Sequence, residues 1–478
     1  MTDFLLVMWV SALIELRRMG WMFGLGKRWT PGEKLKLLFA GYNGTRNTGS
    51  DVRVQEMLRQ VRHVLGAENV DFSVMTQNFE RTKGYFEGSR QVHLPDVYPP
   101  FLFREVHANH GVISCEGSMF KSKFANALTT MMIGSLGLAS AENKLSVAYG
   151  GDAGHMDDLI QWMCARYTSE SLVITRSLES QQLLASLGVP NELGADTAWT
   201  FEPHPQEYAR KALRAAGWDE KTPILALCPI HPFVWPVRAS IAKYFARATT
   251  GAYKESQYRT VYFFESGAEV ERKFKHYVNG YIHAAKAFVQ KHRVLPILVA
   301  MERLDAMACR AIEKELPGTP VITSDDYDMF QLVSILRACT YMVSSRYHGI
   351  VTCMPAGVVS AGVTMDERIR NLMRERGHQH LLLDVDDPGL GPKLLEVMEH
   401  LVVEADAIRE SIGRTVVANL KGMARMATFL EDEVRKTYPE FPLRKGVLSW
   451  EDNLPLLPED LRKLAEEFDT SAAVAVGH

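Results

Sequence analysis

The sequence predicts an α/β protein with two doubly wound, Rossmann-like domains that face each other across a cleft, flanked by helical N- and C-terminal extensions. Short apolar runs alternate with amphipathic helical segments from residue 35 onward, which is the rhythm of a mostly parallel sheet covered on both faces. The link Pro203-His204-Pro205 interrupts this alternation, and the pattern begins again near residue 224. A chain of 478 residues is long enough for two large domains with extensions.

Residues 1–32 form the N-terminal extension, which we expect to be an apolar or amphipathic helix. The run from Phe4 to Ile14 is too short to span a bilayer core of about 30 Å. It also lacks the basic start of a signal peptide, because Asp3 precedes it. The pattern suits either a helix docked on the body of the protein or peripheral contact with a membrane surface. The expected location is cytoplasmic, and the alternative is peripheral attachment to the inner face of the membrane.

Residues 33–205 form the expected first domain. Its predicted strands are Leu35 to Ala40, Val70 to Met75, Gly111 to Cys115, Leu145 to Tyr149 and Ser171 to Thr175. The stretch from Asn78 to Val97 is polar and aromatic, and it predicts a loop with little regular structure.

Residues 206–390 form the expected second domain. Its predicted strands are Ile224 to Cys228, Thr260 to Phe264, Val294 to Ala300, Pro320 to Thr323, Thr340 to Val343 and, as the last one, Val358 to Val363. Residues 391–478 form a helical C-terminal extension. We expect a break in its longest helix near Ser411-Ile412-Gly413 and a disordered end over residues 470–478.

The composition limits the partners and cofactors to be expected. The 54 Lys and Arg residues nearly balance the 57 Asp and Glu residues, so the net charge of −3 gives no reason to expect a nucleic-acid partner. Any anion site must therefore be local. The six cysteines are scattered without the spacing of a zinc site, and we expect neither a bound metal nor a disulfide framework.

The most informative segment is Ser344-Ser345-Arg346-Tyr347-His348-Gly349, which lies between a β-favouring run and an apolar helix start. Open parallel sheets bind ligands where a strand end turns into a helix, and the N–H groups of a helix start favour anions. Arg346 supplies a permanent cation there, and His348 has the side chain best suited to proton transfer near neutral pH. From this hexapeptide alone, a surface arginine beside a helix-capping histidine explains the pattern equally well.

Several segments, taken in order, resemble the polysaccharide pyruvyl transferase family, whose members have the two-domain fold of B-type glycosyltransferases. The resemblance covers residues 35–385 and rests on Gly41 to Asp51, Glu116-Gly117-Ser118, Thr175 to Ser180 with Leu187-Gly188, Asp196-Thr197-Ala198, and Ser344 to His348. Three of these elements depart from the family pattern. Ser50 and Ser177 stand where Asp is usual, Asp51 stands where Glu is usual, and Glu116 to Ser118 replaces a glycine triplet.

The resemblance implies a transferase that takes pyruvate from phosphoenolpyruvate and attaches it to two hydroxyls of a saccharide as a cyclic ketal, releasing phosphate. The implied partners are a small-molecule donor and a saccharide acceptor, without a cofactor. In this interpretation Arg346 binds the carboxylate or phosphate of the donor. His348 handles the proton, since an imidazole with a pKa of about 6.5 can both donate and accept near pH 7.

Two more arginines and one histidine are candidate anion ligands. Arg176 sits at a strand end, although an ion pair with Glu179 or Asp196 explains it as well. Arg368 follows the last predicted strand, and it either closes over the donor phosphate or is a solvated helix charge. His231 lies between prolines after the first strand of the second domain, either as a ligand contact or as part of a rigid turn.

The glycine-rich turn is the candidate substrate-binding loop. Gly41, Gly44 and Gly49 either let the backbone approach a ligand or simply form the turn. Asn47 either bonds a sugar hydroxyl or caps the following helix. Asp51 is either a general base or a partner of the helix dipole.

Two other functions remain open at this stage. A glycosyltransferase with a nucleotide-sugar donor would use the same cleft, but we see no acidic pair at a strand end that would clearly grip a ribose. A binding protein that has kept the fold and lost the reaction fits the altered motifs. The side chains of Tyr253, Tyr258 and Tyr262 either stack on a sugar or pack in the core. The sequence does not determine the oligomeric state.

Overall fold

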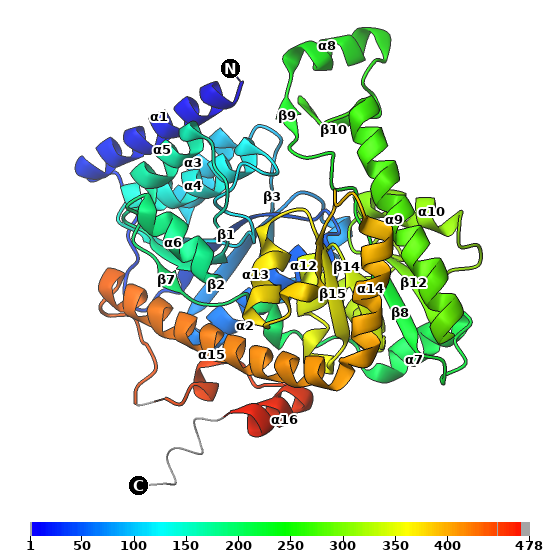
Figure 1. Ribbon diagram of the computed structural model, residues 1–478. Coiled ribbons are helices and arrows are strands. Elements are labelled where there is room, and N and C mark those ends of the chain that lie inside the picture. Colours follow the sequence, from blue (N-terminus) through cyan, green and yellow to red (C-terminus); the bar gives the residue numbers. More distant parts are fainter. Residues whose placement is uncertain (1, 447, 470–478) are drawn as a thin grey trace.

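Two parallel sheets dominate the computed structural model, which describes residues 2–446 and 448–469 (Figure 1). The prediction of two doubly wound α/β domains is confirmed. The expected disorder of residues 470–478 lies outside the described residues.

The first sheet has seven parallel strands in the order β3-β2-β1-β4-β5-β6-β7. They are β1 (Leu35–Asn43), β2 (Val70–Thr76), β3 (Arg90–His93), β4 (Gly111–Ser114), β5 (Leu145–Gly151), β6 (Leu172–Thr175) and β7 (Glu192–Leu193). Leu38 and Ala40 of β1 face a core built with α1 (Thr2–Met22), α3 (Pro99–Ala108), α4 (Asn126–Ala141), α5 (Asp158–Tyr167) and α6 (Leu178–Ser186). Leu37 and Phe39 face the opposite core, which contains α2 (Thr48–Leu65) and α15 (Ala405–Thr437).

The second sheet has six parallel strands in the order β13-β12-β8-β14-β15-β16. They are β8 (Ile224–Cys228), β12 (Leu295–Ala300), β13 (Val321–Thr323), β14 (Tyr341–Ser344), β15 (Val359–Thr364) and β16 (Leu382–Asp384). Leu225 and Leu227 face α9 (Ala268–His292), α10 (Ala306–Glu313) and α14 (Leu390–Val403). The other face packs with α7 (Gln206–Ala215), α11 (Met329–Arg337), α12 (Tyr347–Val351), α13 (Glu367–Glu375) and α16 (Glu459–Phe468).

Both sheets reverse their strand order at one point, and these two points face the same cavity. In the first sheet the reversal lies between β1 and β4, and in the second between β8 and β14. Loops that leave the carboxyl ends of strands on either side of such a reversal diverge and leave a crevice for ligands. The two domains are in direct contact here, because the Thr48 N–H at the start of α2 donates a 2.9 Å hydrogen bond to the carbonyl of Met301, which follows β12.

Three predictions about individual elements were wrong. The expected loop at residues 78–97 contains β3, an edge strand, and β16 follows the strand predicted to be the last. The expected strand at residues 260–264 belongs instead to a small antiparallel sheet of β9 (Arg238–Ala239), β10 (Gln257–Arg259) and β11 (Tyr262–Phe263), which carries α8 (Ile241–Thr250).

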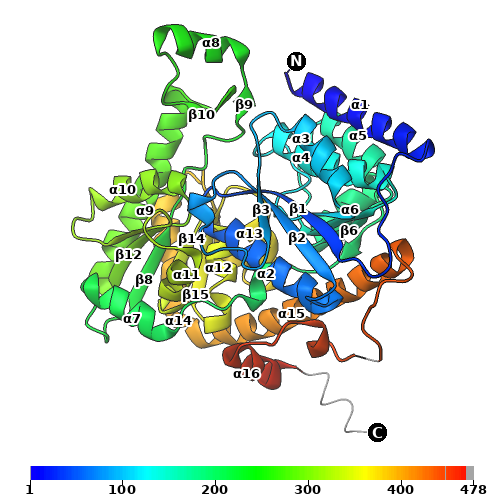
Figure 2. The same cartoon turned by 180° about the vertical axis from the view of Figure 1, so that it is seen from behind.

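The C-terminal helices also break at a different place from the one expected. The helix is interrupted at Glu404, between α14 and α15, and it runs unbroken through Gly413. A Cβ at Gly413 would come within 2.4 Å of the Phe468 ring on α16, so the glycine permits close packing of two helices. Both views place α15 along the lower edge of both sheets (Figure 1, Figure 2). Its contacts with α2, β5 and β15 tie the two domains together.

The N-terminal helix α1 is docked on the first domain. Val10 and Ile14 are buried against Gly134 and Gly137 of α4, where an added Cβ would come within 2.6 and 2.8 Å of those side chains. Within residues 2–446 and 448–469, no helix has both the length and the hydropathy to cross a membrane.

Candidate active site

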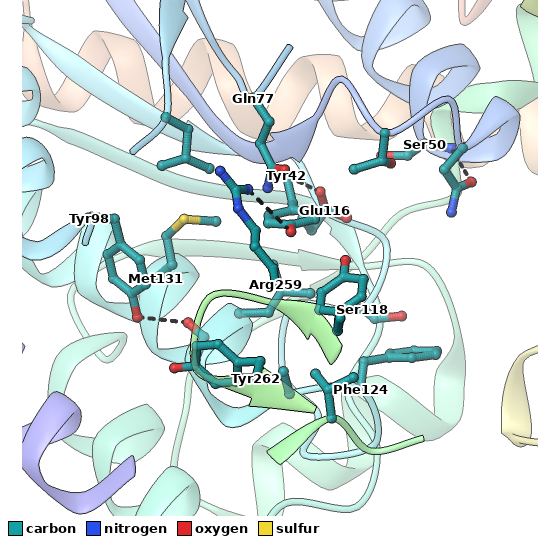
Figure 3. Close-up of a pocket in the computed structure, with 18 of the residues that line it drawn as sticks. Tyr42, Ser50, Gln77, Tyr98, Glu116, Ser118, Phe124, Met131, Arg259 and Tyr262 are labelled. Atoms are coloured by element: carbon teal, nitrogen blue, oxygen red, sulfur yellow. Dashed lines mark hydrogen bonds between the residues drawn. The ribbon is translucent and has the colours of Figure 1, made fainter. Parts of the chain in front are cut away.

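A cavity of about 480 Å³ lies between the two domains at the carboxyl ends of both sheets. Its polar end is formed by the loops that follow β1, β4, β12 and β14, and its other end is lined mainly by apolar and aromatic side chains. Figure 3 shows Arg259 pointing toward Tyr42 and Glu116 at the polar end and Tyr262 at the apolar end; Nη1 of Arg259 donates to the Tyr42 hydroxyl at 3.4 Å. The volume is in the range of pockets that bind small molecules.

The start of α2 is fitted closely against the second domain. Asn47 caps α2 by accepting a 3.2 Å hydrogen bond from the Ser50 N–H, and its amide donates to Glu302 at 3.2 Å. Gly49 lies against His348, and a Cβ there would come within 2.4 Å of Nδ1 of the imidazole. A side chain at position 49 would therefore displace His348.

His348 pairs with a carboxylate of the other domain. Its Nε2 lies 3.3 Å from Oδ2 of Asp196, a fully buried residue that caps the short helix Thr197–Thr200. The same oxygen accepts hydrogen bonds from Nε of Arg53, at 3.1 Å, and from Nη1 of Arg176. Asp196 therefore connects α2, the end of β6 and the helix α12 of the second domain.

Arg53 is fully buried and satisfies several backbone groups besides Asp196. Its guanidinium donates to the carbonyls of Cys115 at 2.6 Å, Tyr149 at 2.7 Å and Gly150. These carbonyls belong to the ends of β4 and β5, so Arg53 holds both strand ends against α2.

Arg176 links Asp196 to a second buried carboxylate, Asp152. Its Nε donates to Asp152 at 2.9 Å, and its guanidinium lies 4.3 Å from the centre of the Tyr347 ring in the second domain. Burial alone raises the pKa of Asp152, but Arg176 and Lys121 outweigh it and lower this pKa to about 2. Arg176 is thus a permanently paired cation beneath the cavity, and it is not among the residues that line it.

The neighbours of Asp196 and His348 shift their pKa values. Burial alone raises the pKa of Asp196, but His348, Arg53 and Arg176 outweigh it and hold this pKa well below its usual range. Burial lowers the pKa of His348, and the charges of Arg176 and Arg53 lower it further, although Asp196 acts against them. His348 is therefore a neutral imidazole at neutral pH, beside an ionised carboxylate.

Arg346 lies at the polar end of the cavity with its charge already matched. Its Nε donates to Asp305 at 2.8 Å, and its Nη2 donates to both Asp305 and Glu302 at 2.6 Å. Burial lowers the pKa of Arg346, but the two carboxylates outweigh this and raise it above its usual value. The third guanidinium nitrogen of Arg346, Nη1, has no hydrogen-bond acceptor among the described residues.

Three carboxylates gather around the polar end of the cavity. Glu116 lines the cavity and accepts a 2.6 Å hydrogen bond from the Tyr42 N–H. Burial raises the pKa of Asp51 to about 8, with Glu116 and Glu302 adding to the increase and Arg46 opposing it. Burial and Glu302 also raise the pKa of Glu116. Asp51 therefore retains a proton at neutral pH.

Five of the sequence-predicted site residues line the cavity together: Asn47, Gly49, Arg346, His348 and Arg368. Nε of Arg368 donates to both oxygens of Asp366, at 2.8 and 3.0 Å, which orients its guanidinium.

The other predicted site residues do not line the cavity. Gly41 faces the Cys115 thiol, and Gly44 has a φ of +88° in the turn, so both shape the loop. Asp51 is buried within the first turn of α2. His231 stacks on Phe274 with the ring centres 3.9 Å apart, among the helices of the second domain.

Sequence reasoning missed several residues of the site. Glu302 and Asp305 follow β12 and form an acidic pair at a strand end. This position after a predicted strand could have identified them from the sequence. Arg53 stands between two apolar residues on a helix that is buried on almost all sides, which is typical of a buried ion pair. Asp152 and Arg259 gave no comparable signal.

Among the described residues, one group has the donor atoms for a metal ion. The ligand atoms of His380, His400 and Glu404 lie within 4.8 Å of one another. The group is partly exposed and lies away from the cavity, and both histidines already bond to Glu404, at 3.0 and 2.6 Å. These hydrogen bonds account for the arrangement without an ion.

Residues 156–367, which are less than half of the chain, match the family model for polysaccharide pyruvyl transferase. Arg176, Asp196, Arg346 and His348 lie within this segment. The search among curated proteins found no match.

Solved structures show similarity of fold over most of the chain. A UDP-N-acetylglucosamine 2-epimerase has a TM-score of 0.52 at 10% identity, covering 87% of this chain and 100% of that one. The S. aureus MnaA–UDP co-structure has a TM-score of 0.51 at 9% identity, covering 86% and 100%. A putative UDP-N-acetylglucosamine 2-epimerase from Listeria monocytogenes has a TM-score of 0.50 at 10% identity, covering 84% and 97%. These similarities support the two-domain fold of the B type.

We expect Asp196→Asn to destabilise the protein strongly, because Arg53 would lose its carboxylate partner and remain a buried cation, while Arg176 would keep only Asp152. Removing one partner of a buried ion pair typically costs about 3–5 kcal/mol, which denaturant unfolding measures. The control Asp384→Asn removes the partner of Arg370 in an exposed ion pair and should leave the midpoint nearly unchanged. Similar small losses in both variants would contradict the central role of Asp196.

The lowered pKa of His348 gives a signed pH dependence of stability. Because the folded pKa lies below the unfolded value of about 6.5, the unfolded chain takes up this proton first as the pH falls. The contribution of a neutral His348 is therefore complete above about pH 6.5 and is lost at lower pH. The difference in unfolding midpoint between the wild type and His348→Gln should shrink from about pH 8 to pH 5. A difference that grows toward acid pH would mean that Asp196 keeps His348 protonated.

Proposed function

We propose that this protein transfers pyruvate from phosphoenolpyruvate to a saccharide as a cyclic ketal and releases phosphate. The observation that carries the proposal is the His348–Asp196 pair beside Arg346, at the polar end of an interdomain cavity. All three residues lie in the segment that matches the pyruvyl transferase family.

This reaction needs both an acid and a base. Carbon 3 of the donor takes a proton, so that carbon 2 becomes oxocarbenium-like and accepts the first hydroxyl oxygen. The bond from carbon 2 to the phosphate oxygen then breaks with its electrons on phosphate, and the second hydroxyl closes the ring. Of the two protons that the hydroxyls release, one balances the proton given to carbon 3 and the other leaves with phosphate. Acid–base groups typically contribute about 10²–10⁴-fold to such steps.

Glu116 and His348 suit these two roles, because their surroundings shift their pKa values in opposite directions. Glu116 lines the cavity with a raised pKa, and we assign it the proton for carbon 3. The neutral His348 accepts the proton of an attacking hydroxyl, and Asp196 stabilises the imidazolium that forms. This assignment narrows the sequence-based hypothesis, in which His348 both donates and accepts.

The donor and acceptor need different parts of the cavity. Arg346 and Arg368 can bind the carboxylate and phosphate of the donor, since the carboxylates bonded to them hold their guanidinium groups in fixed orientations. Trp235 and Tyr258, whose ring centres lie 6.0 Å apart, also line the cavity and offer aromatic faces to a sugar ring.

A glycosyltransferase with a nucleotide-sugar donor is the second candidate, and the pair Glu302 and Asp305 favours it. Acidic side chains at strand ends bind ribose hydroxyls in doubly wound folds. Both carboxylates here already accept hydrogen bonds from Arg346, so we rank this candidate second.

Donor screening tests the proposal directly. The purified chain is incubated with phosphoenolpyruvate or with UDP-sugars, and its thermal unfolding is followed. A donor at 100 times its dissociation constant stabilises the folded state by about 2.7 kcal/mol. We expect phosphoenolpyruvate to stabilise the protein and to release phosphate when methyl glycosides of common hexoses are added. Stabilisation by UDP-sugars alone would support the second candidate, and no effect of either donor would indicate a non-catalytic protein.

Substitutions separate the assigned roles. His348→Ala and Glu116→Gln should each lower kcat by about 10²–10⁴-fold and leave phosphoenolpyruvate binding largely intact. Arg346→Lys should weaken binding of the donor, because lysine lacks the planar fork of the guanidinium. His231→Ala is the control, since His231 lies outside the cavity, and it should keep wild-type kinetics. Full activity of His348→Ala would refute the assignment of the base.

A further inference from the structure

Helix α1 has an apolar face that no other described element covers. The face with Val10 and Ile14 packs on α4, whereas Leu16 and Met19 are 51% and 52% exposed. Further exposed apolar residues on this helix and just beyond it are Phe4, Leu5, Met8, Trp9, Met22, Phe23 and Leu25. The sequence between Asp3 and Glu15 contains no charged residue. Exposed apolar surface of this extent marks an interaction site.

A second exposed helix lies on the same side of the molecule. Helix α8 has no buried residue, and its Ile241 and Phe245 are exposed. Both views place α8 and the start of α1 at the top of the molecule, on either side of a gap between the ribbons (Figure 1, Figure 2).

The segment around α8 is strongly basic in a chain whose net charge is −3. Residues 238–259 contain five basic side chains and one acidic side chain, Glu255. Lys243, Arg247 and Lys254 have no acidic partner among the described residues, and Lys243 instead lies over the rings of Tyr253 and Phe263. Unpaired positive charge beside exposed apolar side chains complements an anionic lipid surface.

The cavity reaches the protein surface between these two helices. Leu5, Leu6 and Trp9 of α1 form part of its wall, and Val261 and Tyr262, at strand β11 of the small sheet that carries α8, form another part. Leu5 and Trp9 are both among the exposed residues, so the exposed face of α1 continues into the apolar end of the cavity.

We propose that α1 and α8 together dock the protein on an anionic lipid surface, with the mouth of the cavity facing that surface. Helix α1 thus both packs on the first domain and contacts lipid, which combines the two alternatives that the sequence leaves open. Tryptophan and basic side chains are suited to the headgroup region. A second copy of the chain is less suitable as a partner, since the same basic segment would meet itself across a symmetric interface.

This docking goes beyond the proposed reaction and does not depend on it. Where the proposed function also holds, the acceptor saccharide enters the cavity from the membrane side.

Vesicle sedimentation with the full chain tests the docking. We expect binding to phosphatidylcholine vesicles that contain about 30 mol % phosphatidylglycerol and much weaker binding to phosphatidylcholine alone. Raising the salt from about 0.1 to 1 M should release most of the bound protein. Leu16→Glu with Met19→Glu, and separately Phe245→Glu, should each lower the partition coefficient about tenfold. None of these three residues lines the cavity.

Control variants place Glu on exposed apolar positions elsewhere. Val403→Glu and Leu456→Glu change side chains that are 82% and 80% exposed, and both should bind vesicles like the wild type. No binding of the wild type to anionic vesicles would overturn the proposal. A concentration-dependent dimer in analytical ultracentrifugation that Leu16→Glu abolishes, without any vesicle binding, would also overturn it in favour of a second copy. Neither readout uses phosphoenolpyruvate, so failure of the proposed reaction and failure of the docking are distinguishable.

Discussion

The arrangement of the site depends on the carboxylate of Asp196. One of its oxygens accepts hydrogen bonds from Arg53 and Arg176 of the first domain and lies 3.3 Å from Nε2 of His348 in the second. The partners of such a buried carboxylate are mutually dependent, because any member left alone carries a large desolvation penalty. The position of His348 is thereby fixed by the packing of the first domain. Gly49 completes this constraint, since it lets α2 approach the imidazole closely.

The charges around the cavity are balanced within the protein, and this limits how an anion can bind. Arg346 and Arg368 already form ion pairs with carboxylates of the protein. An anionic ligand must therefore bind to the remaining guanidinium N–H groups or displace those carboxylates. Added negative charge also raises the pKa of nearby carboxyl groups. Binding of an anionic donor would therefore draw a proton onto Glu116, whereas Asp51 already holds one at neutral pH. A donor such as phosphoenolpyruvate would in this way help to prepare the acid that the reaction needs.

The fold and the Arg346–His348 motif could be predicted from the sequence because both are local patterns. Apolar period and strand-to-helix turns require only neighbouring residues. The ion pair of Arg176 with Asp196 was one of the alternatives that the sequence offered, and the structure confirms it. The rest of the network could not be predicted, since Arg53 and Asp152 join it only after distant strands are paired. The same reason explains β16, a strand of three residues whose assignment depends on its edge pairing with β15. Glu302 is the exception, since its place after β12 was visible in the sequence.

The departures from the pyruvyl transferase pattern make electrostatic sense when they are considered together. Ser177 caps α6 and donates to Asp152, where an aspartate would bring a second carboxylate against the first. Ser50 lines the cavity close to Asp51, so an aspartate there would add a fourth carboxyl group to Asp51, Glu116 and Glu302. Glu116 itself stands where the family pattern has glycine. A carboxyl group gained at position 116 and one absent from position 50 leave the number of carboxyl groups in this loop region unchanged, which agrees with the role of proton donor that we propose for Glu116.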